Sequence, residues 1–133
     1  MSAHGGPVRD PLDRMSLLDT TQVSLESAMR GSMMDQTYLA NNLANASTPG
    51  FQAQAVNFQG ELESALQAGQ SPSSVNFTAA AEGGVNSADG NGVDAEQTSA
   101  QISENGLLYQ DLTKVAAARE QIMLTAIGQG GSA

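Results

Sequence analysis

The sequence contains no cysteine and no tryptophan, and its only aromatic residues are two tyrosines and three phenylalanines. Without cysteine the chain can form neither a disulfide nor a zinc–thiolate site, and it has no thiol nucleophile. Leu, Ile, Val and Phe together supply only 25 of the 133 residues. A chain this poor in large apolar side chains buries little area by itself. We therefore expect either partial disorder or other chains that complete its core.

Positive charge is also scarce, since five Lys and Arg residues face 14 Asp and Glu residues in a chain of net charge −9. Residues 31–113 contain nine acidic residues and no Lys or Arg, whereas residues 114–133 carry Lys114 and Arg119 against Glu120 alone. This distribution argues against nucleic acid or anionic lipid as a partner, because both demand a basic surface. No apolar run is long enough for a membrane span or for the core of a secretory signal peptide.

The side chains that usually carry catalysis are missing or badly placed. The single histidine, His4, lies in an N-terminal segment rich in Gly and Pro, and no structured histidine could activate a serine. A phosphate-binding loop is absent as well, and Lys114 is the only lysine. We expect no enzymatic activity, no cofactor, no metal site and no small-molecule substrate.

The periodicity predicts a mainly α fold with long helices at both ends of the chain. Residues 1–14 form an expected flexible leader, and a helix is predicted over about 16–46, where apolar residues recur every seven positions. Gln22, Ser32 and Gln36 fall in the same stripe and are expected to weaken it. The predicted coiled-coil seam of this helix consists of Leu18, Leu25, Met29, Leu39 and Leu43.

A second long helix is predicted over about 94–127, with Gly128 near its end and a tail over 129–133. We expect the two long helices to lie antiparallel, because neither has another sizeable partner in the chain. The predicted seam of the second helix consists of Ile102, Leu108, Tyr109, Leu112, Val115, Ile122 and Met123.

The middle of the chain is predicted to be less regular, although residues 15–128 are expected to form one domain. Residues 47–67 indicate a loop and a short helix over about 57–67, and the Gly/Ser-rich stretch 68–92 is predicted to be a flexible loop. A turn is expected before the last helix, at Asp89, Gly90, Asn91 and Gly92. The same residues resemble a calcium loop, but Val93 and Ala100 stand where oxygen ligands are required.

The segment Asn42–Phe51, NLANASTPGF, combines a helix end rich in amides, a Pro-Gly turn and an aromatic residue. Read from physics alone, it is a helix stop. Asn side chains can bond the last carbonyls of a helix or a neighbouring backbone, and Gly50 permits positive φ. The residues we assign to a candidate assembly motif are Asn42, Leu43, Asn45, Thr48, Pro49, Gly50 and Phe51.

This segment resembles the motif near the N-terminus of bacterial flagellar rod and hook proteins, close to N-(I/L)-A-N-A-x-T-P-G-(Y/F). A second block, DGNGVD at 89–94 followed by ENGLLYQ at 104–110, is similar to the C-terminal half of the short proximal-rod, or FlgB, type. Residues 1–14 have no expected counterpart in that type. The resemblance covers most of residues 15–128.

The resemblance implies a structural subunit of the proximal rod of the flagellar basal body, in the periplasmic space. Such a subunit polymerises with other axial proteins into a helical tube that transmits torque and surrounds the export channel. It would be exported without a cleaved signal peptide. The implied partners are copies of itself, other rod proteins, the rod-base adaptor protein and export gate, and the inner-membrane (MS) ring. Another rod subunit of the same family and a non-flagellar coiled-coil adaptor remain as alternatives.

Overall fold

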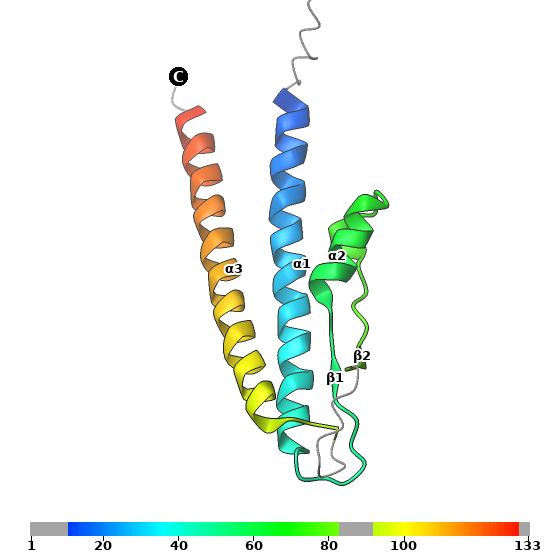
Figure 1. Ribbon diagram of the computed structural model, residues 1–133. Helices are drawn as coiled ribbons and strands as arrows, with labels where there is room; N and C mark the ends of the chain where they lie inside the picture. Colours follow the sequence, from blue (N-terminus) through cyan, green and yellow to red (C-terminus); the bar gives the residue numbers. More distant parts are fainter. Residues whose placement is uncertain (1–10, 83–91, 131–133) are drawn as a thin grey trace, which may run out of the picture.

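The computed structural model describes residues 11–82 and 92–130, with the side chains of 19–82 and 92–128. Two long helices, α1 (Pro11–Ala44) and α3 (Ala95–Gly130), run antiparallel and pack side by side (Figure 1). This confirms the prediction of a mainly helical chain whose long terminal helices pack together. The elements between them are β1 (Gln54–Ala55), α2 (Phe58–Gln67), the 3₁₀ helix η1 (Pro72–Ser74) and β2 (Ala80–Ala81).

Both long helices are longer than the sequence indicated, although α1 ends at Ala44 and not near residue 46. Helix α1 begins at Pro11 and not near residue 16, so residues 11–14 of the expected leader are helical. Proline has no backbone N–H, but the N–H groups of the first helical turn have no partner within the helix in any case, and the fixed φ of proline suits this position. Helix α3 continues to Gly130 and not to about 127, because glycine lowers helix stability without blocking the helical conformation. Residues 1–10 of the predicted leader and 131–133 of the predicted tail lie outside the described residues.

The segment predicted to be a flexible loop is partly built into the structure. Residues 68–82 hold η1 and β2, and β2 pairs antiparallel with β1, with Gln54 opposite Ala81. Val75 and Phe77 are each only 8% exposed. The prediction was wrong for this part, because two apolar side chains suffice to anchor a polar segment when a neighbouring helix offers a surface. Asp89, Gly90 and Asn91 of the predicted turn lie outside the described residues, and Gly92 forms an isolated bridge with Gln52.

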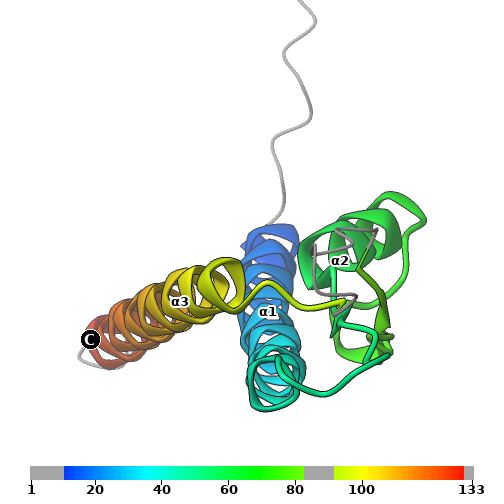
Figure 2. The same cartoon turned by 60° about the horizontal axis from the view of Figure 1, so that its bottom comes forward.

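The largest group of buried apolar side chains lies under α2. Helices α2 and α3 lie on different sides of α1, as Figure 2 shows. The rings of Phe58 and Phe77 meet edge to face, with centroids 6.5 Å apart, and the guanidinium of Arg30 lies 5.6 Å from the Phe77 ring centroid. The core consists of Val56, Phe58, Leu62, Ala65, Val75 and Phe77.

A glycine in the middle of α1 permits the close approach of α2. A Cβ atom placed on Gly31 would lie 2.4 Å from Cβ of Phe58 and 2.9 Å from its Cγ. By helix propensity alone, a glycine at this position weakens α1. In the structure its missing side chain lets Phe58 pack directly on the α1 backbone.

Candidate assembly site

Helices α1 and α3 meet around a buried polar cluster. Ser32 is fully buried, and its hydroxyl donates a hydrogen bond of 2.9 Å to Oδ1 of Asn105. The Asn105 amide nitrogen donates to the backbone carbonyl of Ser32 and to Oε1 of Gln36, both at 2.8 Å. Ser32 and Gln36, which were expected to weaken the helix pair, therefore form its best-bonded contact. Such directional bonds are satisfied at one alignment of the two helices only, so they select the register.

Two further glutamine contacts bridge the same helices. Gln36 Nε2 donates to the carbonyl of Ile102 at 3.4 Å, and Gln22 Nε2 donates to the carbonyl of Ala116 at 3.3 Å. Among the predicted seam residues, Leu39 is fully buried. The half-buried ones are Leu25, Met29, Ile102, Leu108, Tyr109, Leu112 and Met123.

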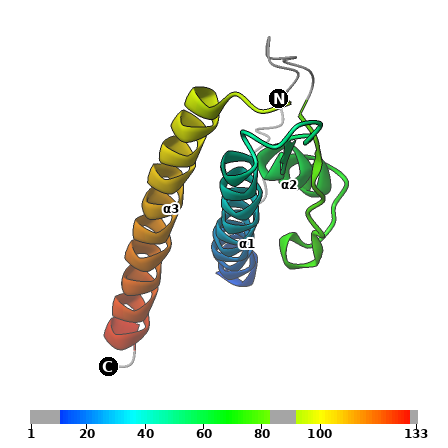
Figure 3. The same cartoon turned by 90° about the horizontal axis from the view of Figure 1, so that it is seen from below.

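Three predicted seam residues lie on the surface of the single chain. Leu43 is 37% exposed, Val115 48% and Ile122 68%. For Ile122 the cause is visible in Figures 1 and 3, where α3 diverges from α1 toward its C-terminal end. Val115 stands beside Ala116, which is buried against α1, and therefore lies on another face of α3. The side chain of Leu18 lies outside those described. The apolar stripe of α3 is therefore longer than the surface that α1 covers.

Side chains of α1 hold the segment that follows the helix. Asn42 is buried, its Nδ2 donates to the carbonyl of Gln54 at 2.8 Å, and its Oδ1 accepts from the Gln54 N–H at 3.1 Å. One amide side chain thus satisfies both polar groups of a backbone residue in β1. Two turns earlier, the carboxylate of Asp35 accepts a hydrogen bond of 2.8 Å from the N–H of Val56. The returning chain is fastened to α1 at two points.

The turn between helix and strand is built by the remaining residues of the motif. Asn45 Nδ2 donates to the carbonyl of Asn41 at 2.8 Å, which satisfies an acceptor at the helix end. The Thr48 hydroxyl donates to Oδ1 of Asn45 at 3.2 Å. Pro49 is exposed, Gly50 has a φ of 75° in the left-handed region, and Phe51 is half-buried. Glycine is the residue that adopts this φ without strain.

Asp35 and Glu61 were missed as positioning residues. Glu61 accepts a hydrogen bond from the Thr78 hydroxyl at 2.6 Å and from the Thr78 N–H at 3.1 Å. A signal existed for Asp35, since it precedes Asn42 by seven residues and so lies on the same face of a helix. No local signal links Glu61 to a partner 17 positions along the chain.

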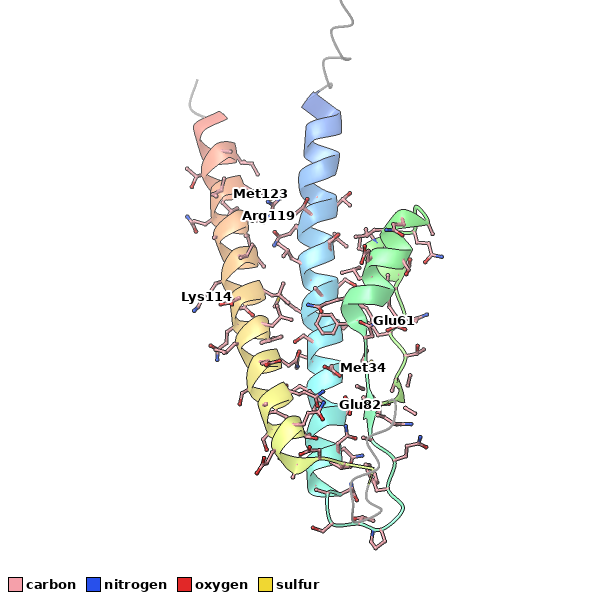
Figure 4. The ribbon with its side chains drawn as sticks, viewed as in Figure 1. Met34, Glu61, Glu82, Lys114, Arg119 and Met123 are labelled. Atoms are coloured by element: carbon pink, nitrogen blue, oxygen red, sulfur yellow. The ribbon has the colours of Figure 1, made fainter. Side chains whose placement is uncertain are left out.

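A cleft of about 610 Å³ separates α3 from β1, β2 and α2. Four carboxylates line it, those of Asp35, Glu61, Glu82 and Glu104, beside apolar residues that include Leu39 and Leu108. Burial raises the pKa of Asp35 above its ordinary value, the bond from Val56 N–H opposes this rise, and the nearby negative charge of Glu82 adds to it. Figure 4 shows Glu61 and Glu82 on the side of the molecule opposite Lys114.

The described residues contain no group of three or more His, Cys, Asp or Glu side chains placed to hold a metal ion. None of the described helices combines the length and the apolar character needed to cross a membrane. The architecture is an elongated pair of helices aligned by a buried polar cluster, with the segment after α1 fastened to α1 by hydrogen bonds.

Comparison with known proteins assigns the chain to a family. Residues 35–52, which include Asp35 and Asn42, match the family model described as flagella basal body rod protein. FlgB of Bacillus subtilis is 30% identical over 112 residues, 75% of this chain and 87% of that protein. FlgB of Escherichia coli is 31% identical over 117 residues, 71% of this chain and 85% of that protein, and FlgB of Yersinia ruckeri is 29% identical over 115 residues, 71% and 84%. The chain belongs to the FlgB family of flagellar basal-body rod proteins.

Proposed function

We propose that this rod subunit forms part of the proximal rod, where it polymerises with copies of itself and with other axial proteins into a helical tube. The tube transmits torque by mechanical coupling and surrounds the export channel. The rod-base adaptor protein, the export gate and the inner-membrane (MS) ring are its further neighbours. The subunit reaches the periplasmic space by export without a cleaved signal peptide.

The observation that carries this proposal is the exposed apolar surface of α3. Leu107, Ile122, Leu124 and Ile127 are between 57% and 69% exposed in a chain whose own core is small. Large apolar side chains left in water along one helix are typical of a surface that another protein covers. Contacts that repeat head to tail without closing a ring generate a helical assembly.

The candidate motif fits a role in assembly, because it fixes where the chain leaves α1. Gly50→Val places a β-branched residue at a φ of 75°, which costs about 1–3 kcal/mol. In a strain lacking the gene, the wild-type chain should restore motility and copurify with basal bodies. The Gly50→Val variant should be exported and yet fail to assemble, since export uses the unfolded chain.

Phe51→Ala tests the same segment through packing and should give the same pattern of export without assembly. Ser47→Ala, at an exposed position of the same turn, is the matched control and should support motility. Retention of the Gly50 and Phe51 variants in the cytoplasm would assign the motif to export recognition and would overturn its structural role.

A further inference from the structure

Among the side chains that the structure describes, those of the distal part of α3 combine net positive charge with exposed apolar groups. Residues 114–133 carry Lys114 and Arg119 against Glu120. Lys114, Ala118 and Ile122 follow one another at four-residue spacing and therefore lie along one face of the helix. All three are exposed, and Figure 4 shows Lys114 pointing away from α1. Within the described residues nothing covers this face.

The acidic cleft offers the complementary chemistry on another part of the same molecule. Its lining includes the carboxylates of Asp35, Glu61, Glu82 and Glu104 and contains no Lys or Arg. Burial raises the pKa of Asp35 and the negative charge of Glu82 adds to this rise, so these two carboxylates repel each other in the single chain. A cation seated in the cleft would relieve that repulsion, and the half-buried Leu108 in the lining would receive apolar side chains.

We propose that the distal face of α3 from one copy, carrying Lys114, Ala118 and Ile122, docks in the acidic cleft of a second copy. The two surfaces are different parts of the chain, so the contact is heterologous, and a pair of copies still has one free cleft and one free helix end to which further copies can add. This inference rests on the proposed function and names the contact by which one copy would join the next.

A second groove runs along the other flank of the helix pair, lined by Met33, Gln36, Thr37, Ala40, Gly106 and Tyr109 among others. It contains no charged side chain, so it offers Lys114 no acceptor. Charge complementarity therefore favours the acidic cleft, and the uncharged groove becomes an alternative that the experiment separates.

Site-directed disulfide cross-linking between two full-length chains tests the contact, and the absence of native cysteine removes any background. One copy carries Ile122→Cys and a size tag, and the other carries Ala81→Cys in the lining of the cleft. Oxidation of the mixture should give the mixed dimer. Leu124→Cys is the matched control, because this residue is similarly exposed two positions along α3 but on another face. A partner carrying Thr37→Cys reports on the uncharged groove.

A charge swap then tests the electrostatic argument. Lys114→Glu in the Ile122→Cys copy should lower the yield of the mixed dimer on the order of ten-fold, through repulsion by the cleft. Adding Glu104→Lys to the Ala81→Cys copy should restore it, because the pair is then opposite in charge again.

The outcomes separate this contact from the function on which it rests. Equal yields from Ile122→Cys and Leu124→Cys, preferential linking to Thr37→Cys, or no rescue by the charge swap would each overturn the proposed contact. The rod assignment would fail by a different result, namely if the wild-type chain did not copurify with basal bodies. If the yield of the mixed dimer falls with Lys114→Glu and recovers with Glu104→Lys, and the wild-type chain copurifies with basal bodies, both the proposed contact and the rod assignment are supported.

Discussion

Gly31 shows how a single residue sets the distance between two elements. Alanine is the better helix former by about 1 kcal/mol, so local propensity alone favours Gly31→Ala. The new Cβ atom would lie 2.4 Å from Cβ of Phe58, however, and forcing a methyl group into a packed contact costs about 1–3 kcal/mol. Phe58 belongs to the core beneath α2, so it cannot retreat without disturbing its contact with Phe77.

We therefore expect Gly31→Ala to lower the free energy of unfolding by about 1–2 kcal/mol, measured by urea denaturation. Gly106→Ala is the control of opposite sign. Gly106 is also helical, but no atom lies within 4 Å of a Cβ placed on it, so Gly106→Ala should raise the free energy of unfolding by up to about 1 kcal/mol. A stabilised Gly31→Ala variant would mean that the contact with Phe58 yields easily.

Asp35 makes stability depend on pH. Its pKa in the folded chain is raised above the ordinary value of 3.8, mainly by burial. Between these two values the folded state binds more protons than the unfolded state, so the contribution of Asp35 to stability falls as the pH rises. Asp35→Asn keeps an oxygen that can accept the Val56 N–H bond but removes the charge.

In a series of urea denaturation curves at different pH values, Asp35→Asn should remove this part of the pH dependence. The free energy of unfolding of the variant should exceed that of wild type most at pH values above the raised pKa of Asp35. Glu63→Gln, which changes an exposed carboxylate on α2, is the matched control for the loss of one negative charge. An unaltered pH profile in Asp35→Asn would show that Asp35 titrates alike in both states.

At the scale of the elements, the polar cluster of Ser32, Gln36 and Asn105 decides how α1 and α3 align. Replacing Asn105 by alanine removes the partner of the Ser32 hydroxyl and of Gln36 Oε1 at a buried position. Buried polar groups left without partners cost about 1–3 kcal/mol, and we expect Asn105→Ala to lose stability in that range.

Chemical denaturation of the full chain measures this loss. Ser103→Ala, a change on the exposed side of the same helix, is the control and should stay within about 0.5 kcal/mol of wild type. A neutral Asn105→Ala would show that the helix pair rests on its apolar contacts, and the register would then have to come from the fastened loop.

At the scale of the whole molecule, the helix pair is closed at one end and open at the other. The polar cluster, the fastened segment and the buried Leu39 all lie toward the C-terminal part of α1, whereas Ile122, Leu124 and Ile127 near the other end are exposed. A helix end without tertiary contacts is only marginally stable in water.

Amide hydrogen exchange should reveal this gradient. In the isolated chain we expect residues 98–112 of α3 to be protected and residues 118–128 to exchange much faster, since protection follows tertiary burial. In assembled rods the distal residues should become protected as neighbours cover them. Uniform protection along α3 in the isolated chain would contradict an open end.

The sequence by itself determined the features that local patterns encode. Helical periodicity of the apolar residues predicted both long helices, the composition indicated a small core, and the match at Asn42–Phe51 pointed to the rod family. The limits of the helices were predicted less accurately, because the effect of Pro11 or Gly128 on a helix depends on its position within that helix. These signals work because neighbours in sequence share one helix face or one turn, so no distant partner needs to be known.

The tertiary structure alone decided what each face contacts. Ser32 and Gln36 looked like flaws in a seam, and only the presence of Asn105, 73 positions beyond Ser32, makes them its best-bonded part. The burial of Val75 and Phe77 and the need for glycine at position 31 depend on how α2 folds back onto α1. Val115 and Ile122 carry the same apolar pattern as buried residues, yet they remain exposed because α1 does not cover the part of α3 on which they lie. Periodicity shows which side chains share one face of a helix. Which segment packs on that face is set by contacts between residues far apart in the chain.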